Sequence, residues 1–406
     1  MSSRRGLLRR LAALSGAAGL SGCSRLLAQR AEAPTADLPP NPKAGTLPLA
    51  QHTWNDRLRT DSVGNNLLPR HYRLFMLRLD GEMGEESART VELAMRTLEA
   101  AYEFSPEGVL HMLGWGTRYF ERLGALDGSP IRKPKVLSRT DDPELLDFDA
   151  ILVLATDVPS QLTAAEEALF GTRDSLGGEP VDARLGDVFS VEERRTGFLG
   201  EGLPAAHIGA EGLPSELPDD APNFTGFRAG RKSTQAPEER VTIRDGPYAG
   251  GTTMHISHLV ESLDAWWGMA ESDRIDRLFS TDVSPEDVAD MESLPFADAV
   301  REHARDEGVI GHFEKVARAR KDGKPLLLRR DFNTVDGGQA GVQFLSLQRR
   351  PADFEAVRDA MNGWWVREEH PEIEDRKNNG ILEFIRVVSR ANFYVPPRDE
   401  RAFPSG

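Results

Sequence analysis

Ala150-Ile151-Leu152-Val153-Leu154-Ala155 is a fully apolar run, and a run of this length predicts a buried β-strand. The neighbouring elements are a partly alternating strand at residues 72–79, a helix at about 91–101, a strand at 109–116, a helix at about 160–170 and a closing strand at 188–191. This β-α-β-β-α-β order defines a ferredoxin-like module. The first half of the chain is therefore expected to form one such module.

The second half repeats the pattern. Strands are predicted at residues 252–259, 326–332, 342–347 and 383–388, with helices at 260–269 and about 351–362. Charged helical sequence at 284–320 is inserted between the first two of these strands. The sequence thus predicts an α+β protein with two ferredoxin-like modules of the dimeric α+β barrel type, built from antiparallel sheets with peripheral helices.

The first residues have the features of an export signal. Ser3-Arg4-Arg5-Gly6-Leu7-Leu8-Arg9 is similar to a twin-arginine signal, and Leu20-Ser21-Gly22-Cys23 is similar to a lipobox that would leave Cys23 lipidated. An ordinary small-residue cleavage site with an incidental cysteine is the alternative. The expected location is extracytoplasmic, with a lipid anchor on the outer face of the cytoplasmic membrane as the only membrane contact.

Composition shifts suggest where the parts of the chain begin and end. Residues 1–23 are the signal with its lipobox, and 24–65 read as a flexible tether rich in Pro, Ala and polar residues. Residues 66–200 form the N-terminal module and 240–400 the C-terminal one. The Gly- and Pro-rich residues 201–239 between them are expected to be a linker, functional or disordered.

Charge and cysteine content exclude several classes of function. The formal net charge is −15, which argues against non-specific nucleic-acid binding, because such binding requires cations that neutralise phosphates. Cys23 is the only cysteine, so a disulfide within one chain, or a thiolate metal cluster, is excluded. The sequence leaves a homo-oligomer open.

Two short segments carry residues suited to peroxide chemistry. Gly311-His312 offers an imidazole, which can ligate haem iron, and Leu328-Arg329-Arg330 offers guanidinium groups, which can stabilise charge on a peroxide as its O–O bond breaks. Out of context, His312 would read as an exposed histidine on a charged helix, and the arginines as partners of surface carboxylates.

Several separated segments, taken in order, resemble the dye-decolorising peroxidase family, a haem-binding relative of chlorite dismutase. The resemblance covers roughly Tyr72 to Pro397. It is carried by Gly114–Gly124, Asp149–Asp157, Gly226-Phe227-Arg228-Ala229-Gly230 (similar to a GFxDG motif), Gly251–Trp266, Gly311-His312, Leu328-Arg329-Arg330 and Gly341–Gln348.

The resemblance implies a haem-dependent peroxidase, with one haem b per chain, that reduces hydrogen peroxide at the expense of an organic or metal donor. His312 would be the iron ligand, and Arg329 the principal catalytic group. The residues expected near the haem are Gly226, Phe227, Gly230, His258 and Asn333.

The chain departs from the family pattern at two places. Ala229 stands where the motif has an aspartate that moves a proton, and Ser257-His258 stands where two arginines are common. Alanine cannot carry a proton, so a non-catalytic descendant that binds haem or another partner is the alternative function. Asp331 and Asp245 are the nearest conceivable replacements for the lost carboxylate.

Each remaining candidate has an ordinary structural alternative. His303 is the rival of His312, and Arg330 of Arg329, although adjacent strand residues face opposite ways. Gly226 and Gly230 are either turn glycines or points of close approach to a macrocycle. Asn333 either hydrogen-bonds a distal water or ends its strand. His255 and His258, three apart on a strand, point to opposite faces and make a shared zinc improbable.

Overall fold

The two halves of the chain form two four-stranded antiparallel sheets. The computed structural model describes residues 34, 36–228, 231–289, 300–371, 373 and 379–405; the predicted export signal, Cys23, Ala229 and Gly230 lie outside them. The strand order is β9-β3-β6-β4 in the first sheet and β12-β13-β10-β14 in the second. Each sheet has the ferredoxin-like arrangement, so the predicted fold class is confirmed. The strands are β3 (His71–Leu79), β4 (Leu110–Gly116), β6 (Ala150–Thr156), β9 (Phe189–Phe198), β10 (Thr252–Glu261), β11 (Leu328–Arg329), β12 (Phe332–Thr334), β13 (Gly341–Gln348) and β14 (Ile385–Val395).

The two sheets join edge to edge into a barrel. One seam is a single pairing of Asn333 with Phe198, and the other joins β14 to β4 through Phe393 and Tyr394. Because successive strand residues point to opposite faces, one set of apolar side chains fills the interior. These buried residues include Tyr72, Leu74, Met76, Ile151, Val153, Met254, Ile256, Leu345, Leu347 and Phe393.

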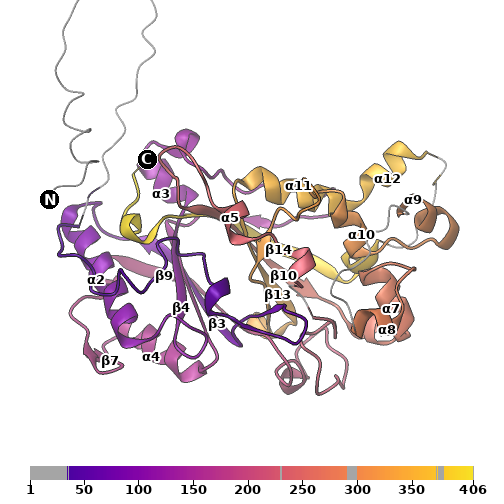
Figure 1. Cartoon of the computed structure of the whole chain (residues 1–406), viewed down its shortest axis with the longest axis horizontal. Helices are drawn as coiled ribbons and strands as arrows, with labels where there is room; N and C mark the ends of the chain where they lie inside the picture. Colours follow the sequence, from indigo (N-terminus) through magenta and orange to yellow (C-terminus); the bar gives the residue numbers. More distant parts are fainter. Residues whose placement is uncertain are drawn as a thin grey trace, which may run out of the picture. The chain divides into compact units, whose positions relative to one another are not determined.

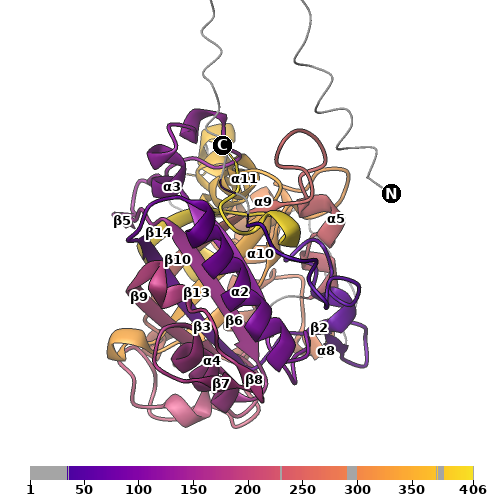
Figure 2. The ribbon, with the colours of Figure 1, turned by 90° about the vertical axis from the view of Figure 1, so that its left-hand side faces the viewer.

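Helices α2 (Glu85–Ala101) and α4 (Pro159–Leu169) cover the outer face of the first sheet (Figure 2). The face of α2 that packs on the sheet carries Val91, Met95 and Leu98, all buried and recurring at helical spacing. Glu85 and Glu86 lie in its first turn, where negative charge interacts favourably with the helix dipole. The apolar spacing in the sequence therefore explains both the helix and the face that it buries.

Helices α10 (His312–Ala317) and α11 (Pro351–Asn362) belong to the second half and lie on the far side of the barrel from α2 and α4 (Figure 1). Pro351 opens α11, where its missing N–H is not needed, and Gly363 ends it with a left-handed φ of 68°. The ring of Phe354 on α11 stacks on His255 of β10, with the ring centroids 3.6 Å apart. This contact holds α11 against the outer face of the second sheet.

The remaining elements are short. They include α3 (Thr117–Arg122), α5 (Glu238–Val241), α6 (Asp264–Trp267), α7 (Glu271–Leu278), α8 (Pro285–Ala289), α9 (Val300–Glu302) and α12 (Trp364–Glu369). None of the described helices combines the length and apolarity needed to cross a bilayer.

The predicted helix at 260–269 is wrong at its start. Val260 and Glu261 continue β10, pairing with Arg386 and Ile385 of β14, and the helix α6 begins only at Asp264. Pairing on both sides of the strand outweighs the local helical pattern, because each paired residue adds backbone hydrogen bonds. Because Glu261 is the last residue of β10, its side chain lies on one face of the sheet.

Two predicted strands also have different bounds in the structure. The strand expected at 326–332 is divided into β11 and β12, and Leu326 and Leu327 pack with Phe354 outside the ladder. The last strand starts at Ile385 instead of residue 383, and it runs to Val395. Residues 201–228 are also more than a linker: they are folded against the second half, with Phe224 completely buried.

Candidate functional site

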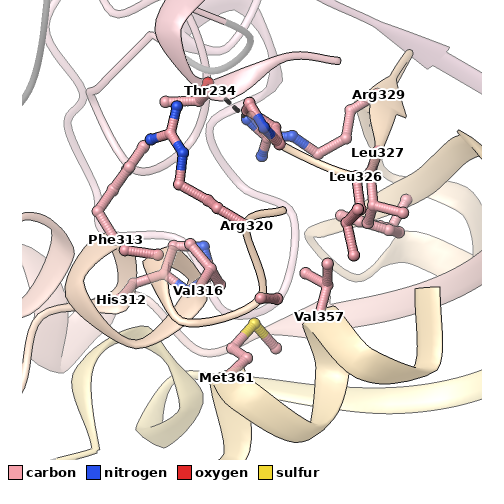
Figure 3. Close-up of a pocket in the computed structure, with 14 residues that line it drawn as sticks. Thr234, His312, Phe313, Val316, Arg320, Leu326, Leu327, Arg329, Val357 and Met361 are labelled. Carbon is pink, nitrogen blue, oxygen red and sulfur yellow. Dashed lines mark hydrogen bonds between the residues drawn. The ribbon is translucent and has the colours of Figure 1, made fainter. Parts of the chain in front are cut away.

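A cavity lies between the outer face of the second sheet and helices α10 and α11. It consists of two adjoining pockets, of about 620 and 860 Å³ including space open to solvent, and His312, Phe313, Arg329, Phe344 and Met361 line both. We call this the His312–Arg329 cavity (Figure 3). Most of its lining is apolar and comes from β10, β13, α10, α11 and the 199–228 segment. An apolar lining with a few convergent polar groups is typical of a site for an organic ligand.

His312 is the first residue of α10, and two local features fix it there. The Glu314 carboxylate accepts a hydrogen bond from the Gly311 N–H, at 2.8 Å. A Cβ on Gly311 would lie 1.9 Å from the Phe279 carbonyl oxygen, so only glycine permits this close approach. Burial, together with the positive charges of Lys315 and Arg329, lowers the pKa of His312 to about 3. The imidazole is therefore neutral at physiological pH, as metal ligation requires.

Within the described residues, the buried Nδ1 of His312 has no hydrogen-bond partner. A metal-ligating histidine usually donates its second N–H to a carboxylate or a carbonyl. The nearest carboxylate in the sequence, Glu314, instead binds the Gly311 N–H and lies 2.7 Å from Nδ1 of His303. His303 is thus held by Glu314 and by Asp282 at 3.3 Å, and it does not line the cavity.

Arg329 and Arg330 have separate environments. Arg329 on β11 lines the cavity, where its guanidinium donates to Thr234 Oγ1 at 3.3 Å. Arg330 is 2% exposed and points the other way: it donates to Asn55 Oδ1 at 2.7 Å and lies 3.3 Å from Glu238 Oε1. The strand alternation thus gives only Arg329 to the cavity.

The Gly226–Phe227 turn packs over one end of the cavity. Gly226 has φ +85°, and a Cβ there would lie 2.8 Å from Cη2 of Trp267. The contact with the Trp267 ring is therefore enough to require a glycine at position 226, without close approach to a macrocycle. Phe227 lines the cavity and meets the ring of Phe279 edge-on at 5.6 Å. Gly230, predicted to lie near the same site, is outside the described residues.

Asn333 reaches the cavity, but its polar atoms are engaged. Its Oδ1 accepts from the Phe224 N–H and its Nδ2 donates to the Phe198 carbonyl, both at 3.2 Å. It thus ties the 199–228 segment to β12.

His258 does not line the cavity. It lies on the opposite face of β10 from Leu259, and burial and the charge of Arg195 lower its pKa. The expected role beside a haem edge therefore has no support from its position. The two aspartates that could replace the missing motif carboxylate lie in different places. Asp331 lines the cavity, whereas Asp245 is exposed on a loop.

The cavity contains one acidic residue that the sequence prediction missed. Glu261, at the end of β10, is 2% exposed and lines the cavity with Leu259. The signal that could have identified it is the alternation of Ser257, Leu259 and Glu261, had the strand been extended by two residues.

A comparison with models of protein families identifies the family to which the chain belongs. A family model described as a family of unknown function, DUF7405, matches residues 69–397. The chain belongs to DUF7405. No curated protein matches this DUF7405 sequence.

Solved structures of dye-decolorising peroxidases share the fold of this DUF7405 chain. A dye-decolorising protein from V. cholerae matches with a TM-score of 0.55 and 15% identity, over 86% of this chain and 98% of that one. DyPB from Rhodococcus jostii matches at 0.53 and 14%, over 83% and 96%. A dye-decolorising peroxidase from Bacteroides thetaiotaomicron matches at 0.54 and 12%, over 86% and 98%. At these identities the likeness shows a common fold.

The residues of the cavity fit a haem. An iron porphyrin needs a large apolar space, a neutral imidazole with a nitrogen available to the metal, and exclusion of water from the ring. The cavity provides apolar walls, and His312 is neutral with its Nδ1 unpartnered within the described residues. Within the described residues there is no cluster of three or more His, Cys, Asp or Glu that could hold a bare metal ion.

Proposed function

We propose that this protein binds haem in the His312–Arg329 cavity and reduces hydrogen peroxide at the expense of a small organic or metal donor, as a peroxidase of the dye-decolorising type. The observation that carries the proposal is the convergence of a neutral imidazole and a guanidinium on one apolar cavity. The fold shared with dye-decolorising peroxidases supports it.

In this proposal each lining residue has a defined task. A bound haem would supply the redox chemistry that couples reduction of peroxide to oxidation of the donor. His312 would hold the iron, since its imidazole is neutral. Arg329 carries a fixed positive charge that stabilises the negative charge developing on a peroxide oxygen. Phe227, Phe344 and the other apolar residues of the lining exclude water, which strengthens that interaction.

One sequence feature favours a second candidate, haem binding without peroxidase turnover. Ala229 occupies the position of the motif aspartate and cannot transfer a proton. A protein that retained the ligand and lost the acid–base group would carry or sense haem. Peroxide reactivity separates this candidate from the first.

Reconstitution with haem tests the proposal. Purified apoprotein is titrated with hemin, and a Soret band that saturates at one haem per chain is expected. The saturated protein is then mixed with hydrogen peroxide in a stopped-flow spectrometer. A protein that stays colourless would overturn both candidates, whereas a Soret band unchanged by excess peroxide would leave haem binding alone.

We further propose export by the twin-arginine route and lipid anchoring at Cys23. The support is the sequence of the leader. Expression with the natural leader should label the protein with radioactive palmitate and place it in the membrane fraction. Cys23→Ser should abolish the label and release the protein; a labelled Cys23→Ser variant, or an unlabelled natural chain, would reject the anchor.

A further inference from the structure

A basic pocket opens on the surface beside the N-terminal end of α11. It encloses about 880 Å³ including space open to solvent, and residues 240–244, the turn at 321–324 and residues 349–353 build it. We call it the Arg349 pocket. Two carboxylates and five cationic side chains line it, an excess of three positive charges in a chain whose formal net charge is −15. The cationic residues are Arg240, Arg244, Lys321, Arg349 and Arg350.

Backbone carbonyl groups hold two of these guanidinium groups in place. Arg349 donates through Nε to the Thr242 carbonyl oxygen at 3.0 Å and through Nη2 to that of Glu239 at 3.3 Å. Its Nη1 has no hydrogen-bond partner within the described residues. Arg240 donates to the Lys321 carbonyl oxygen at 2.9 Å. Carbonyl oxygens carry no net charge, so these contacts position the cations without neutralising them.

The two carboxylates of the pocket neutralise only part of its charge. Asp353 is shared by Arg350, at 3.3 Å, and Lys321, at 4.0 Å. Asp322 is exposed in the turn, where its φ is 53°, and it forms no ion pair within the described residues. The other three cations of the pocket also form no ion pair with a carboxylate among those residues.

Exposed arginines elsewhere in this protein are paired with carboxylates. Arg132 pairs with Glu355 further along α11, and Arg78 on β3 pairs with Asp80. In the Arg349 pocket the opposite holds: partial burial lowers the pKa of Arg349, and the positive charges of its neighbours, Arg244 above all, lower it further. Like charges held together repel each other, so a bound anion would relieve a repulsion that the fold itself imposes.

We propose that the Arg349 pocket binds a small anion that carries a phosphate group with at least two negative charges. Guanidinium groups match the geometry of phosphate oxygens and can form paired hydrogen bonds to them. The first turn of α11, which Arg350 caps and Asp353 belongs to, adds the positive end of the helix dipole. An excess of three positive charges suits a divalent or trivalent anion better than a single carboxylate.

The Arg349 pocket is distinct from the His312–Arg329 cavity. None of its five cations lines that cavity, and only Leu326 lines both. The inference therefore goes beyond the proposed function and does not depend on haem.

Isothermal titration of the protein with pyrophosphate, in a buffer without other multivalent anions, tests the site. One saturable site per chain is expected. Arg349→Gln removes hydrogen bonds from a charged donor, so the Kd should rise about tenfold or more. Arg244→Gln removes an exposed charge, so the Kd should rise about three- to fivefold. Arg78→Gln removes the same charge far from the pocket and should bind pyrophosphate like wild type.

Two results of this titration would overturn the proposal. One is the absence of saturable binding by the wild-type protein, and the other is an unchanged Kd in Arg244→Gln. Arg244 has no hydrogen-bond or ion-pair partner within the described residues, so its replacement should leave the fold intact. This variant decides the matter even if Arg349→Gln fails to fold.

Two further comparisons identify the anion. Citrate, a trivalent carboxylate, should bind more weakly than pyrophosphate at equal ionic strength, and tighter binding of citrate would reject a phosphate site. Sedimentation with vesicles of phosphatidic acid and phosphatidylcholine separates the sources of phosphate, with Cys23→Ser in every sample so that no lipid anchor contributes. Sedimentation that is lost in Arg349→Gln would assign a lipid headgroup. Pyrophosphate binding without sedimentation would assign a soluble phosphate compound, and either result supports the site.

Discussion

His312 and Arg329 enter one cavity from two different elements, the first turn of α10 and the short strand β11 (Figure 3). The guanidinium is close enough to help lower the pKa of the imidazole to about 3. One cavity thus combines a permanent positive charge with a neutral imidazole at physiological pH. Neither group is consumed by an ion pair with a carboxylate in the described residues.

Replacing His312 by alanine should abolish the Soret band of the reconstituted protein, because the iron loses its proposed ligand. The matched control is His258→Gln, since His258 lies on the other face of β10 and outside the cavity. Hemin titration of both variants, with circular dichroism as a check on folding, measures the difference. Equal haem uptake by wild type and a folded His312→Ala would contradict the assignment.

Replacement by leucine should affect a different property at each of the two adjacent arginines. Arg329→Leu removes charge from the cavity, so reaction with peroxide should slow by about 10²- to 10³-fold, with little change in stability. Arg330→Leu removes the buried cation that pairs with the partly buried Glu238, so unfolding should require about 3 kcal/mol less free energy. Urea unfolding and stopped-flow mixing together measure both effects. The reverse pattern would show that Arg330 is the functional residue.

Gly226→Ala should destabilise the protein for two reasons, a left-handed φ and a clash with Trp267. Gly246→Ala serves as the control, because Gly246 has a similar φ of +82° and open space around its Cβ. The control should lose about 1–2 kcal/mol from backbone strain alone, and Gly226→Ala should lose more. Equal losses in urea unfolding would mean that the Trp267 ring moves aside freely.

The stability of the protein should depend on pH through Glu261. Its pKa is about 8 in the folded chain and near the ordinary value of 4.5 when the chain is unfolded. Below pH 4.5 both states are protonated; between pH 4.5 and 8 only the unfolded state releases the proton, so stability falls as pH rises. The slope from this group should approach about 1.4 kcal/mol per pH unit.

Urea unfolding of wild type and Glu261→Gln across this range checks the prediction. Glutamine does not titrate, so the stability difference between the two proteins should shift steadily in favour of the variant up to pH 8 and then level off. A difference that is constant with pH would show that Glu261 is ionised in the folded protein.

Much of the fold could be read from the chain, because burial imposes a period on the residues that experience it. The alternation of residues 72–79, the apolar run 150–155 and the spacing of Val91, Met95 and Leu98 identify strands and a helix that the structure contains. Errors fall where backbone pairing between distant segments overrides the local pattern, as at Val260 and Glu261.

The sequence by itself determined the two ferredoxin-like modules and the candidates His312 and Arg329, since residue type and period are local properties. The tertiary structure alone decided which of these residues share a cavity, because facing depends on partners far apart in the chain. In the folded chain, Arg330 and His258 point away from the cavity, and Asn333 is hydrogen-bonded to backbone groups. Glu261 lies among apolar residues of the cavity lining. The pKa of that carboxyl is set by desolvation, a property of the folded surroundings that no stretch of sequence carries.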